Sequence, residues 1–291
     1  MRLPKFEYFA PKTLEEALVL LKEQGEGAHV MAGGTDVVVK MTHGRLKPKA
    51  VIALREIEEL NGIRFDAKEG LTIGATARLA EVASHPDILN HYPALAHSVQ
   101  VMANVEVRNM GTVAGNLCNA APSADSAPPL IVMGAEVTLA SLKAKRRVGL
   151  DRFFKGPGLT AMEQGEILTS IHVPPPRSRS GASYMRISAR CGVDIAAVGV
   201  GVMADFNGEG CKQAKIVLGA VAPIPMRAEK TEDLLQGREW TDELIDRAGD
   251  QAAAEARPIS DVRASSEWRK RMVAVLTRRT LQEAHARARR G

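Results

Sequence analysis

MAGGTDVVVK, residues 31–40, sets two adjacent glycines, a threonine and an aspartate between short apolar stretches. Glycine has no Cβ and tolerates positive φ, so the backbone N–H groups of Gly33 and Gly34 can face a ligand. Consecutive free amides form a concave anion site suited to phosphate, and the Thr35 hydroxyl adds a donor. The alternative is a tight turn between a strand at 29–32 and the apolar run at 37–41. Taken alone, the stretch favours that turn.

A second stretch, NMGTVAGNLCNAAPSAD at 109–125, repeats these features and shifts the balance. It is rich in small and turn-forming residues, which predicts a long ordered loop. Residues 111–116 again combine glycines with a threonine and an amide side chain. Two such loops on separate strands could hold the two phosphates of a dinucleotide from two sides. Asp125 follows, and its carboxylate can accept hydrogen bonds from ribose or ribityl hydroxyls; the alternative role is an N-cap or turn residue.

Hydrophobic periodicity predicts the elements around these two loops. A capping-box pattern of Thr13 with Glu16 starts a helix whose apolar residues recur at i, i+3, i+4 and i+7, and glycines at 25 and 27 end it. The turn DAKEG predicts a hairpin. The further elements expected up to residue 173 are a strand at 50–54, hairpin strands at 62–65 and 71–75, helices at 78–84 and 93–103, and strands at 136–140, 146–150 and 167–173.

The proline run at 174–176, followed by RSRSG, is the clearest linker in the chain. Beyond it, strands precede helices, an order that favours an α+β domain. These elements are strands at 183–188, 195–203 and 213–218 and helices at 231–236, 241–254 and 265–288. We therefore predict an α+β protein in three units, with boundaries at 1–56, 57–176 and 177–291.

Composition indicates a globular protein that needs no disulfide framework. The chain has 291 residues, of which 45% are hydrophobic and 25% charged. Cys118, Cys191 and Cys211 are odd in number and widely separated, so they provide neither a CxxC pair nor the four thiolates of an iron–sulfur cluster. The N-terminus lacks the apolar region of a signal peptide, and the longest apolar stretch, 195–204, is too short to span a bilayer. We expect a cytoplasmic protein without a membrane span.

The charge is concentrated at the C-terminus. The formal net charge is +5, and residues 262–291 hold nine Lys and Arg against two Glu. A basic tail could contact nucleic acid. We favour a helix with a solvated or partner-facing charged side, and expect no nucleic-acid partner.

Familiar catalytic patterns are missing from the chain. GVGVMA at 199–204 fits GxGxxA, but it lies inside an apolar run and precedes a turn, which indicates a buried strand rather than a dinucleotide fingerprint. There is no GxSxG, HExxH or Walker A pattern, so we predict no catalytic set and no metal ligands in this chain. The residues alone lead to a two-loop nucleotide or flavin binder with an added α+β domain.

At this point several motifs, in the expected order and over nearly the whole chain, resemble one known family. It is the FAD-binding medium subunit of the xanthine dehydrogenase and carbon monoxide dehydrogenase class of molybdenum hydroxylases. The motifs are AGGTD at 32–36, RNMGTVAGNLCNAAPSAD at 108–125, EILTSIHVP at 166–174, DIAAVGVGV at 194–202, GAVAPIPMRA at 219–228 and DVRASSEWR at 261–269.

The resemblance implies a fold and a cofactor site. The fold would be a two-subdomain FAD-binding domain of the vanillyl-alcohol-oxidase (PCMH) type, followed by a C-terminal α+β domain. Residues 30–37 would hold the pyrophosphate and 112–116 would form the second FAD loop. The matched cofactor-binding positions are Val30, Met31, Ala32, Gly33, Gly34, Thr35, Asp36, Val37, Met102, Thr112, Val113, Ala114, Gly115, Asn116, Asp125, Leu168 and Arg186.

Individual roles also follow from the resemblance. Met102 would lie against the cofactor, Asp125 would bind its hydroxyl-bearing chain, and Leu168 would pack near the isoalloxazine. Arg186 stands where a lysine is common, and a cation there could stabilise anionic reduced flavin; the alternative is a surface ion pair.

Two positions depart from the pattern of the family. The second loop usually reads Thr-Ile-Gly-Gly-Asn, and here Ala114 adds a methyl group where the backbone approaches the ligand. That methyl is tolerable at negative φ and weakens FAD binding at positive φ. Cys191 stands where arginine is common. For Cys118 and Cys191 we favour the role of a small buried apolar residue.

The resemblance implies partners as well. A large chain would carry the molybdopterin cofactor and determine the organic substrate. A small chain would carry [2Fe–2S] clusters, in a dimer of heterotrimers. Electrons would pass through FAD in this chain to NAD or another acceptor. The alternatives are a stand-alone flavin-dependent oxidoreductase on the same scaffold, and a nucleotide-binding module without flavin.

Overall fold

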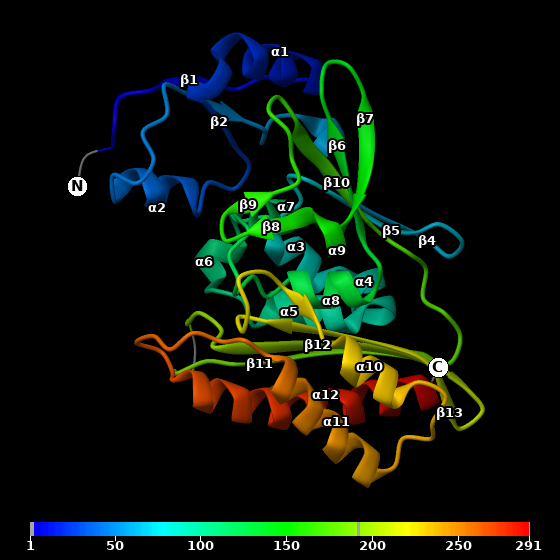
Figure 1. Ribbon diagram of the computed structural model, residues 1–291. Helices are drawn as coiled ribbons and strands as arrows, with labels where there is room; N and C mark the ends of the chain where they lie inside the picture. Colours follow the sequence, from blue (N-terminus) through cyan, green and yellow to red (C-terminus); the bar gives the residue numbers. More distant parts are fainter. Residues whose placement is uncertain (1–2, 191–192, 291) are drawn as a thin grey trace.

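A computed structural model of the protein describes residues 3–190 and 193–290, and it contains three main β-sheets stacked along one axis (Figure 1). The first sheet is parallel, in the order β1-β3-β2, and α1 packs on it. Its elements are β1 (Glu7–Phe9), α1 (Leu14–Gln24), η1 (Gly25–Gly27), β2 (Ala28–Met31), α2 (Val37–Thr42) and β3 (Ala50–Ala53). The predicted helix start is confirmed, because the Thr13 side chain accepts a hydrogen bond from the Glu16 N–H.

The apolar run after the first glycine loop is helix α2, not a strand. The interpretation as a turn between two strands is therefore wrong. Val38 and Val39 are 42% and 53% exposed, whereas Met41 is buried, which is the one-sided burial of a short surface helix.

The second sheet is antiparallel, in the order β4-β5-β10-β6-β7. The predicted hairpin and the strand at 167–173 are confirmed. The strands of this sheet are β4 (Ile63–Asp66), β5 (Gly70–Gly74), β6 (Glu136–Ala140), β7 (Lys145–Gly149) and β10 (Ile167–Val173). The connecting elements are η2 (Glu58–Leu60), α3 (Leu79–Ser84), α4 (Pro86–His91), α5 (Pro93–Gln100), α6 (Val105–Arg108), α7 (Val113–Asn119), α8 (Ala127–Val132), α9 (Leu150–Phe153), β8 (Phe154–Gly156) and β9 (Leu159–Thr160).

The long loop predicted at 109–125 is only partly a loop. Residues Val113–Asn119 form helix α7, with Thr112 as its N-cap. Sequence composition missed it because small residues are common both in loops and in short helices that pack closely. Val113, Ala114 and Leu117 are buried there.

The third sheet is antiparallel, in the order β11-β12-β13-β14, and follows the proline linker as predicted. Helices α10 and α12 pack on one face, with α11 packed against both of these helices, and α5 and α8 from the preceding unit cover the other face (Figure 1). The GxGxxA segment lies in β12, as predicted, and a Cβ at Gly201 would lie 2.9 Å from the backbone of Pro128 in α8. The elements are β11 (Ser180–Ile187), β12 (Val198–Asn207), β13 (Gly210–Gly219), β14 (Met226–Arg227), α10 (Glu229–Leu235), α11 (Asp242–Glu255) and α12 (Ser266–Arg290).

Most of the basic side chains in the C-terminal segment 262–291 form ion pairs with carboxylates of the same chain. Six of its nine cations lie within ion-pairing distance of a carboxylate, including buried Arg269, whose Nη2 is 2.7 Å from Asp261 Oδ1. The others are Arg263, Arg271, Arg278, Arg287 and Arg289. One face of α12 is buried, so the helix is a structural part of the third unit. None of the described helices is long and apolar enough to cross a bilayer.

Cys118, expected to be a small buried apolar residue, is only half-buried and lines the large cavity described below. Cys118 and Cys211 are free thiols, and burial raises the pKa of Cys118 to about 12. Both side chains therefore pack as neutral groups at neutral pH. Cys191 lies outside the described residues.

The packing of α12 on β11 depends on the absence of a side chain at Gly181, since a Cβ there would overlap the Ala284 carbonyl oxygen. We expect Gly181→Ala to destabilise the protein by about 1–3 kcal/mol by forcing helix and sheet apart. Thermal unfolding would show this as a lower Tm. Gly156→Ala is the control, because its Cβ would have ordinary contacts no closer than 3.5 Å. An equal loss of Tm in both variants would contradict this account of the packing.

Candidate functional site

A cavity of about 1400 Å³ lies where the three units meet. It is larger than the roughly 300–1000 Å³ typical of sites for drug-sized ligands, and fits a dinucleotide-sized molecule. The two loops singled out in the sequence form part of its wall. Residues from the third unit, including Val193 and Val262, complete it.

The first glycine loop presents unused backbone donors to this cavity. Within the described residues, the N–H groups of Gly33, Gly34, Thr35 and Asp36 donate no hydrogen bond to the protein. Gly34 has φ 77°, the left-handed conformation that glycine accommodates best. Four successive amides without a protein acceptor are the kind of donors that a phosphate-binding concavity requires.

The two loops pack directly against each other. A Cβ at Gly33 would overlap the Met110 carbonyl oxygen, and a Cβ at Gly111 would lie 3.3 Å from Thr35 Oγ1. Gly33 is therefore required for the two backbones to come this close, whereas a methyl group at Gly111 would need its neighbours to shift by a few tenths of an ångström. The contact sets the width of the cavity at this end.

The second loop leads into α7, and the helix start determines its geometry. Thr112 Oγ1 accepts a hydrogen bond of 2.9 Å from the Gly115 N–H, and Asn116 Oδ1 accepts one of 2.7 Å from the Ser126 hydroxyl. Ala114 lies inside the helix and is not among the residues with positive φ. The extra methyl group of this chain is therefore accommodated, and no backbone strain arises there.

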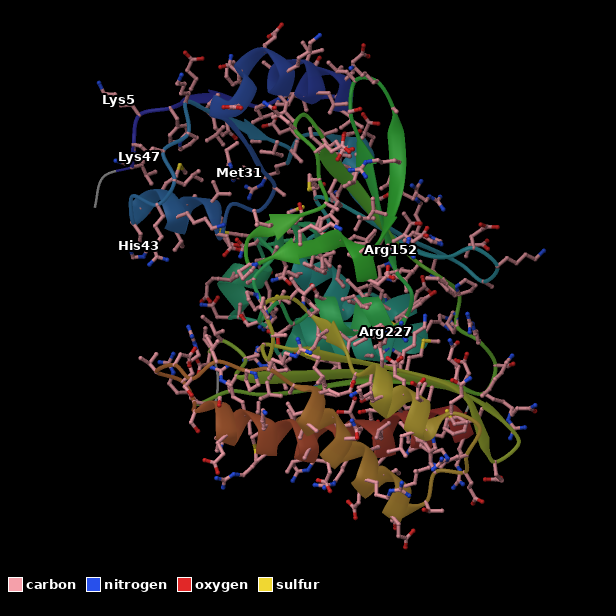
Figure 2. All side chains as sticks on the ribbon, viewed as in Figure 1. Lys5, Met31, His43, Lys47, Arg152 and Arg227 are labelled. Carbon is pink, nitrogen blue, oxygen red and sulfur yellow. The ribbon has the colours of Figure 1, made fainter. Side chains whose placement is uncertain are left out.

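One cation of the first unit faces the cavity. Lys40 lines the wall, and its Nζ donates a 2.6 Å hydrogen bond to Asn119 Oδ1. Half-buried His29 also lines the wall, and its pKa is lowered by burial and by the charge of Lys40. By contrast, the side chains of Lys5, His43 and Lys47 lie along the outer margin of this unit (Figure 2).

Two side chains of β11, a strand of the third unit, fix the position of the Asp125 carboxylate. Its Oδ1 accepts a 2.6 Å hydrogen bond from the Tyr184 hydroxyl, and its Oδ2 lies 2.6 Å from Arg186 Nη1. All three side chains are buried. Burial raises the pKa of Asp125, while Arg186 and the Tyr184 hydroxyl favour its charged form. The alternative given for Arg186, an ion pair, is thus present, although the pair is buried rather than exposed.

Most of the residues predicted to bind a cofactor come together in this cavity. Met31, Val113 and Arg186 are not part of its wall, and Arg186 contributes through Asp125 instead. The predicted residues that line the cavity are Val30, Ala32, Gly33, Gly34, Thr35, Asp36, Val37, Met102, Thr112, Ala114, Gly115, Asn116, Asp125 and Leu168.

Sequence reasoning missed the part of the wall that the third unit supplies. Ala189, Arg190, Val193, Ile195 and Val262 line the cavity although they are more than 60 positions from the second glycine loop. Val193, Ile195 and Val262 stand out only because their apolar side chains are exposed, and the exposure of a side chain cannot be read from a sequence. Lys40 and His29 were missed because a lone Lys or His carries no pattern.

The loop that carries Val262 is fixed by a buried arginine. Arg269 donates to the Ala197 and Ala220 carbonyls at 3.0 and 3.1 Å and to Asp261 Oδ1 at 2.7 Å. Asp261 also accepts from the Arg263 N–H at 2.8 Å. These bonds hold the segment against the third sheet at the mouth of the cavity.

Comparisons with known proteins agree with this geometry. The family model for the FAD-binding domain in molybdopterin dehydrogenase matches residues 4–176. The model for the carbon monoxide dehydrogenase flavoprotein C-terminal domain matches residues 183–284.

Relatives match along nearly their whole length. The carbon monoxide dehydrogenase medium chain of Hydrogenophaga pseudoflava is 32% identical, covering 98% of each chain. The putative xanthine dehydrogenase FAD-binding subunit of Escherichia coli is 29% identical, covering 97% of this chain and 96% of that one.

Solved structures show the same fold. A chain of the carbon monoxide dehydrogenase structure from Hydrogenophaga pseudoflava superposes with a TM-score of 0.94 at 32% identity, covering 99% of each chain. A chain of quinoline 2-oxidoreductase from Pseudomonas putida superposes with a TM-score of 0.93 at 28% identity, also covering 99% of each. The expected α+β fold, with an FAD-binding part and a C-terminal domain, is confirmed, and the cavity fits the FAD that this fold binds.

The contact of the two loops should determine FAD affinity. We expect Gly33→Ala to weaken FAD binding by about 5- to 150-fold, because relieving the overlap with Met110 costs about 1–3 kcal/mol. Titration of the apoprotein with FAD measures this. Gly44→Asn is the control, since a side chain there would meet nothing within 4 Å and asparagine tolerates its φ of 69°. Unchanged affinity in folded Gly33→Ala would show that the loops adapt.

The Asp261–Arg269 pair should contribute stability that is lost in acid. Hydrogen bonds from Arg263 and Arg269 lower the pKa of Asp261 from 3.8 to about 2. Since the folded state favours the carboxylate, its contribution is fully present above about pH 4 and disappears as the pH falls towards 2. We expect Asp261→Asn to lower Tm at neutral pH, with the difference from wild type shrinking over that acidic range. Glu209→Gln, which removes an exposed ion pair, should change Tm little at any pH.

Proposed function

Because the chain belongs to the family of FAD-binding subunits of molybdopterin dehydrogenases, we propose that it serves as the FAD-binding medium subunit of a molybdenum hydroxylase complex. In that role it takes electrons from [2Fe–2S] clusters of a small partner and delivers them to an acceptor such as NAD. The observation that carries the proposal is the large cavity with its two interlocked glycine loops.

The residues of this chain bind and orient the cofactor. The free amides of 33–36 would hold the pyrophosphate, with Lys40 adding positive charge nearby. Asp125, fixed by Tyr184 and Arg186, would accept hydrogen bonds from the hydroxyl-bearing chain. Bound FAD supplies the redox chemistry, because it exchanges single electrons with clusters and electron pairs with NAD.

Apolar side chains lining the wall would exclude water from the flavin. Leu168 is 3% exposed and Met102 7% exposed, and both lie on the cavity wall. A low-dielectric wall strengthens the electrostatic effect of the buried Asp125–Arg186 pair on the ring. In this proposal Arg186 tunes the cofactor through Asp125 rather than by direct contact.

Side chains at the mouth of the cavity support the proposal that a partner chain binds there. Exposed apolar side chains of the third unit lie on its wall, and we call this set the apolar rim. The set consists of Val193, Ile195 and Val262, whose exposed fractions run from 49% to 100%. Clustered exposed apolar residues mark interaction sites, and this one would bring a partner's cluster to the flavin.

The proposal also covers the subunit composition of the complex, its cellular compartment and the division of this chain into units. We propose a dimer of heterotrimers with large and small partner chains in the cytoplasm. We also propose three units at 1–56, 57–176 and 177–291. Each range contains one of the three main sheets complete, although buried Ile57 and Leu60 pack with Leu18 of the first unit.

The test is native purification through a tag on this chain. We expect two co-purifying chains, flavin and iron–sulfur absorption, and anaerobic loss of the oxidised-flavin band on adding NADH. Flavin without partners or iron would favour the stand-alone oxidoreductase. A flavin band that NADH leaves unchanged in the intact complex would contradict NAD as acceptor. A colourless chain that refuses added FAD would overturn the whole proposal.

A matched pair of variants tests the apolar rim. Val262→Asp changes a fully exposed side chain, so folding should stay unchanged, and because Val262 also lines the FAD cavity the variant is compared with wild type at equal FAD content. We expect the same variant to lose the small partner on purification, since it buries an unpaired charge in the interface. Leu89→Asp in α4, at a side chain that is 43% exposed and away from the cavity, should retain the partner. Retention of the partner by both variants would place the interface elsewhere.

A further inference from the structure

We propose that a second cavity, of about 720 Å³, is a binding site for a small organic anion with a flat apolar body, such as an aryl carboxylate. It lies behind the proline linker, where the second and third units meet, and shares no residue with the FAD cavity. Its volume is within the range of about 300–1000 Å³ in which proteins enclose small molecules.

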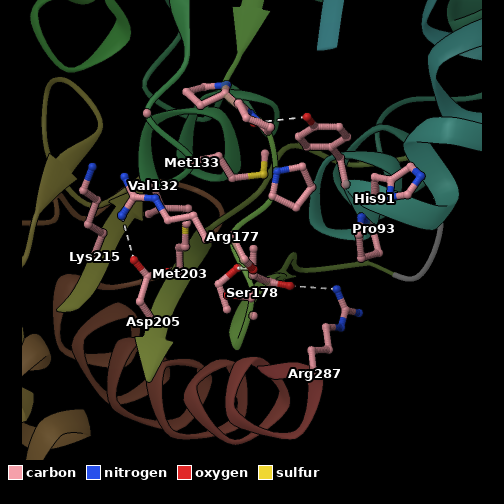
Figure 3. Close-up of a pocket in the computed structure, with 18 of the residues that line it drawn as sticks. His91, Pro93, Val132, Met133, Arg177, Ser178, Met203, Asp205, Lys215 and Arg287 are labelled. Carbon is pink, nitrogen blue, oxygen red and sulfur yellow. Dashed lines mark hydrogen bonds and ion pairs between the residues drawn. The ribbon is translucent and has the colours of Figure 1, made fainter. Parts of the chain in front are cut away.

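The walls of this cavity carry an excess of positive charge (Figure 3). Arg177, Lys215, Arg287 and Arg290 line it, and the one carboxylate among its described lining residues is Asp205. A cleft lined by charges of one sign concentrates the potential and attracts an ion of the opposite sign. The lining therefore selects for an anion.

The acidic side chain does not cancel this charge. Asp205 is buried and its Oδ2 lies 2.7 Å from Arg177 Nη1, so that pair is neutral. Arg287 is paired with Glu283 at 2.9 Å. Within the described residues, Lys215 and Arg290 have no ion pair, which leaves two cations for a ligand.

The surface between the cations is apolar. Val132 and Met133 from the end of α8 face Met203 of β12 (Figure 3), and the linker prolines at 174–176 also line the cavity. Two methionines provide polarizable, adaptable contacts that suit aromatic rings. The cavity thus combines an apolar surface with a few charged groups, the usual composition of a ligand site.

The walls are held in place without a ligand. The Tyr92 hydroxyl donates a 3.1 Å hydrogen bond to the Pro174 carbonyl, and Arg287 donates a 2.8 Å bond to the Ala182 carbonyl. Lys215 reaches from β13 to the second unit, where its Nζ would lie 3.9 Å from a Cβ at Gly134. A preformed site loses less conformational entropy on binding.

The experiment uses the full chain saturated with FAD, so that the first cavity is occupied, and naphthoate as the probe in isothermal titration calorimetry. We expect saturable binding of one naphthoate per chain, weakened by added salt. The neutral amide, naphthamide, should bind at least about tenfold more weakly, because it cannot pair with Lys215 and Arg290.

Two substitutions of Lys215 locate the site. Lys215→Gln should weaken binding severalfold, and Lys215→Glu by at least about tenfold, with FAD content unchanged. Lys212→Glu is the control, since Lys212 is exposed on the same strand and outside the cavity. The absence of saturable binding to the wild type, or equal binding by folded Lys215→Gln and wild type, would overturn the proposal.

Discussion

The contact between the backbones of the two glycine loops is the constraint on which the site depends. Gly33 lies against the Met110 carbonyl so closely that no side chain fits between them. This contact joins the first unit to the second at the point where both loops reach the cavity. Strand β2 ends at the first loop, whereas helices α6 and α7 flank the second. Because the two loops touch through backbone atoms, a side chain does not fit at Gly33. This constraint is the reason that the motif can be recognised in the sequence.

The third unit is attached in a similar way and then completes the site. Gly201 admits α8 to one face of the third sheet, and Gly181 admits α12 to the other. With the sheet fixed between these helices, β11 brings Tyr184 and Arg186 to Asp125. The buried carboxylate thus connects two units as well as facing the cofactor cavity. Breaking such a pair costs more than making it gains, because an unpaired charge would remain buried.

The same arrangement creates both cavities. Helix α8 begins beside Asp125 at the FAD cavity. It ends at Val132 and Met133 in the second cavity, the one proposed to bind an organic anion. Strand β11 likewise runs from Gly181 and Ala182 at one cavity to Arg186 near the other. The interface between second and third units is therefore closed in the middle by packing and open at both ends, where charged side chains gather.

The sequence by itself determined the α+β class, the positions of most strands along the chain and the two glycine loops. These features follow from periodicity and from the special freedom of glycine, which are local properties. Through a resemblance that extends over nearly the whole chain, it also led to about a third of the residues that line the cavity, including both glycine loops. Tertiary structure alone decided that residues 37–42 are helical and that Arg186 pairs with Asp125 without itself lining the cavity. It also decided that Val193 and Val262 close the cavity and that Lys215 faces a second one. These outcomes depend on burial and on contacts between distant residues, and no local pattern encodes them.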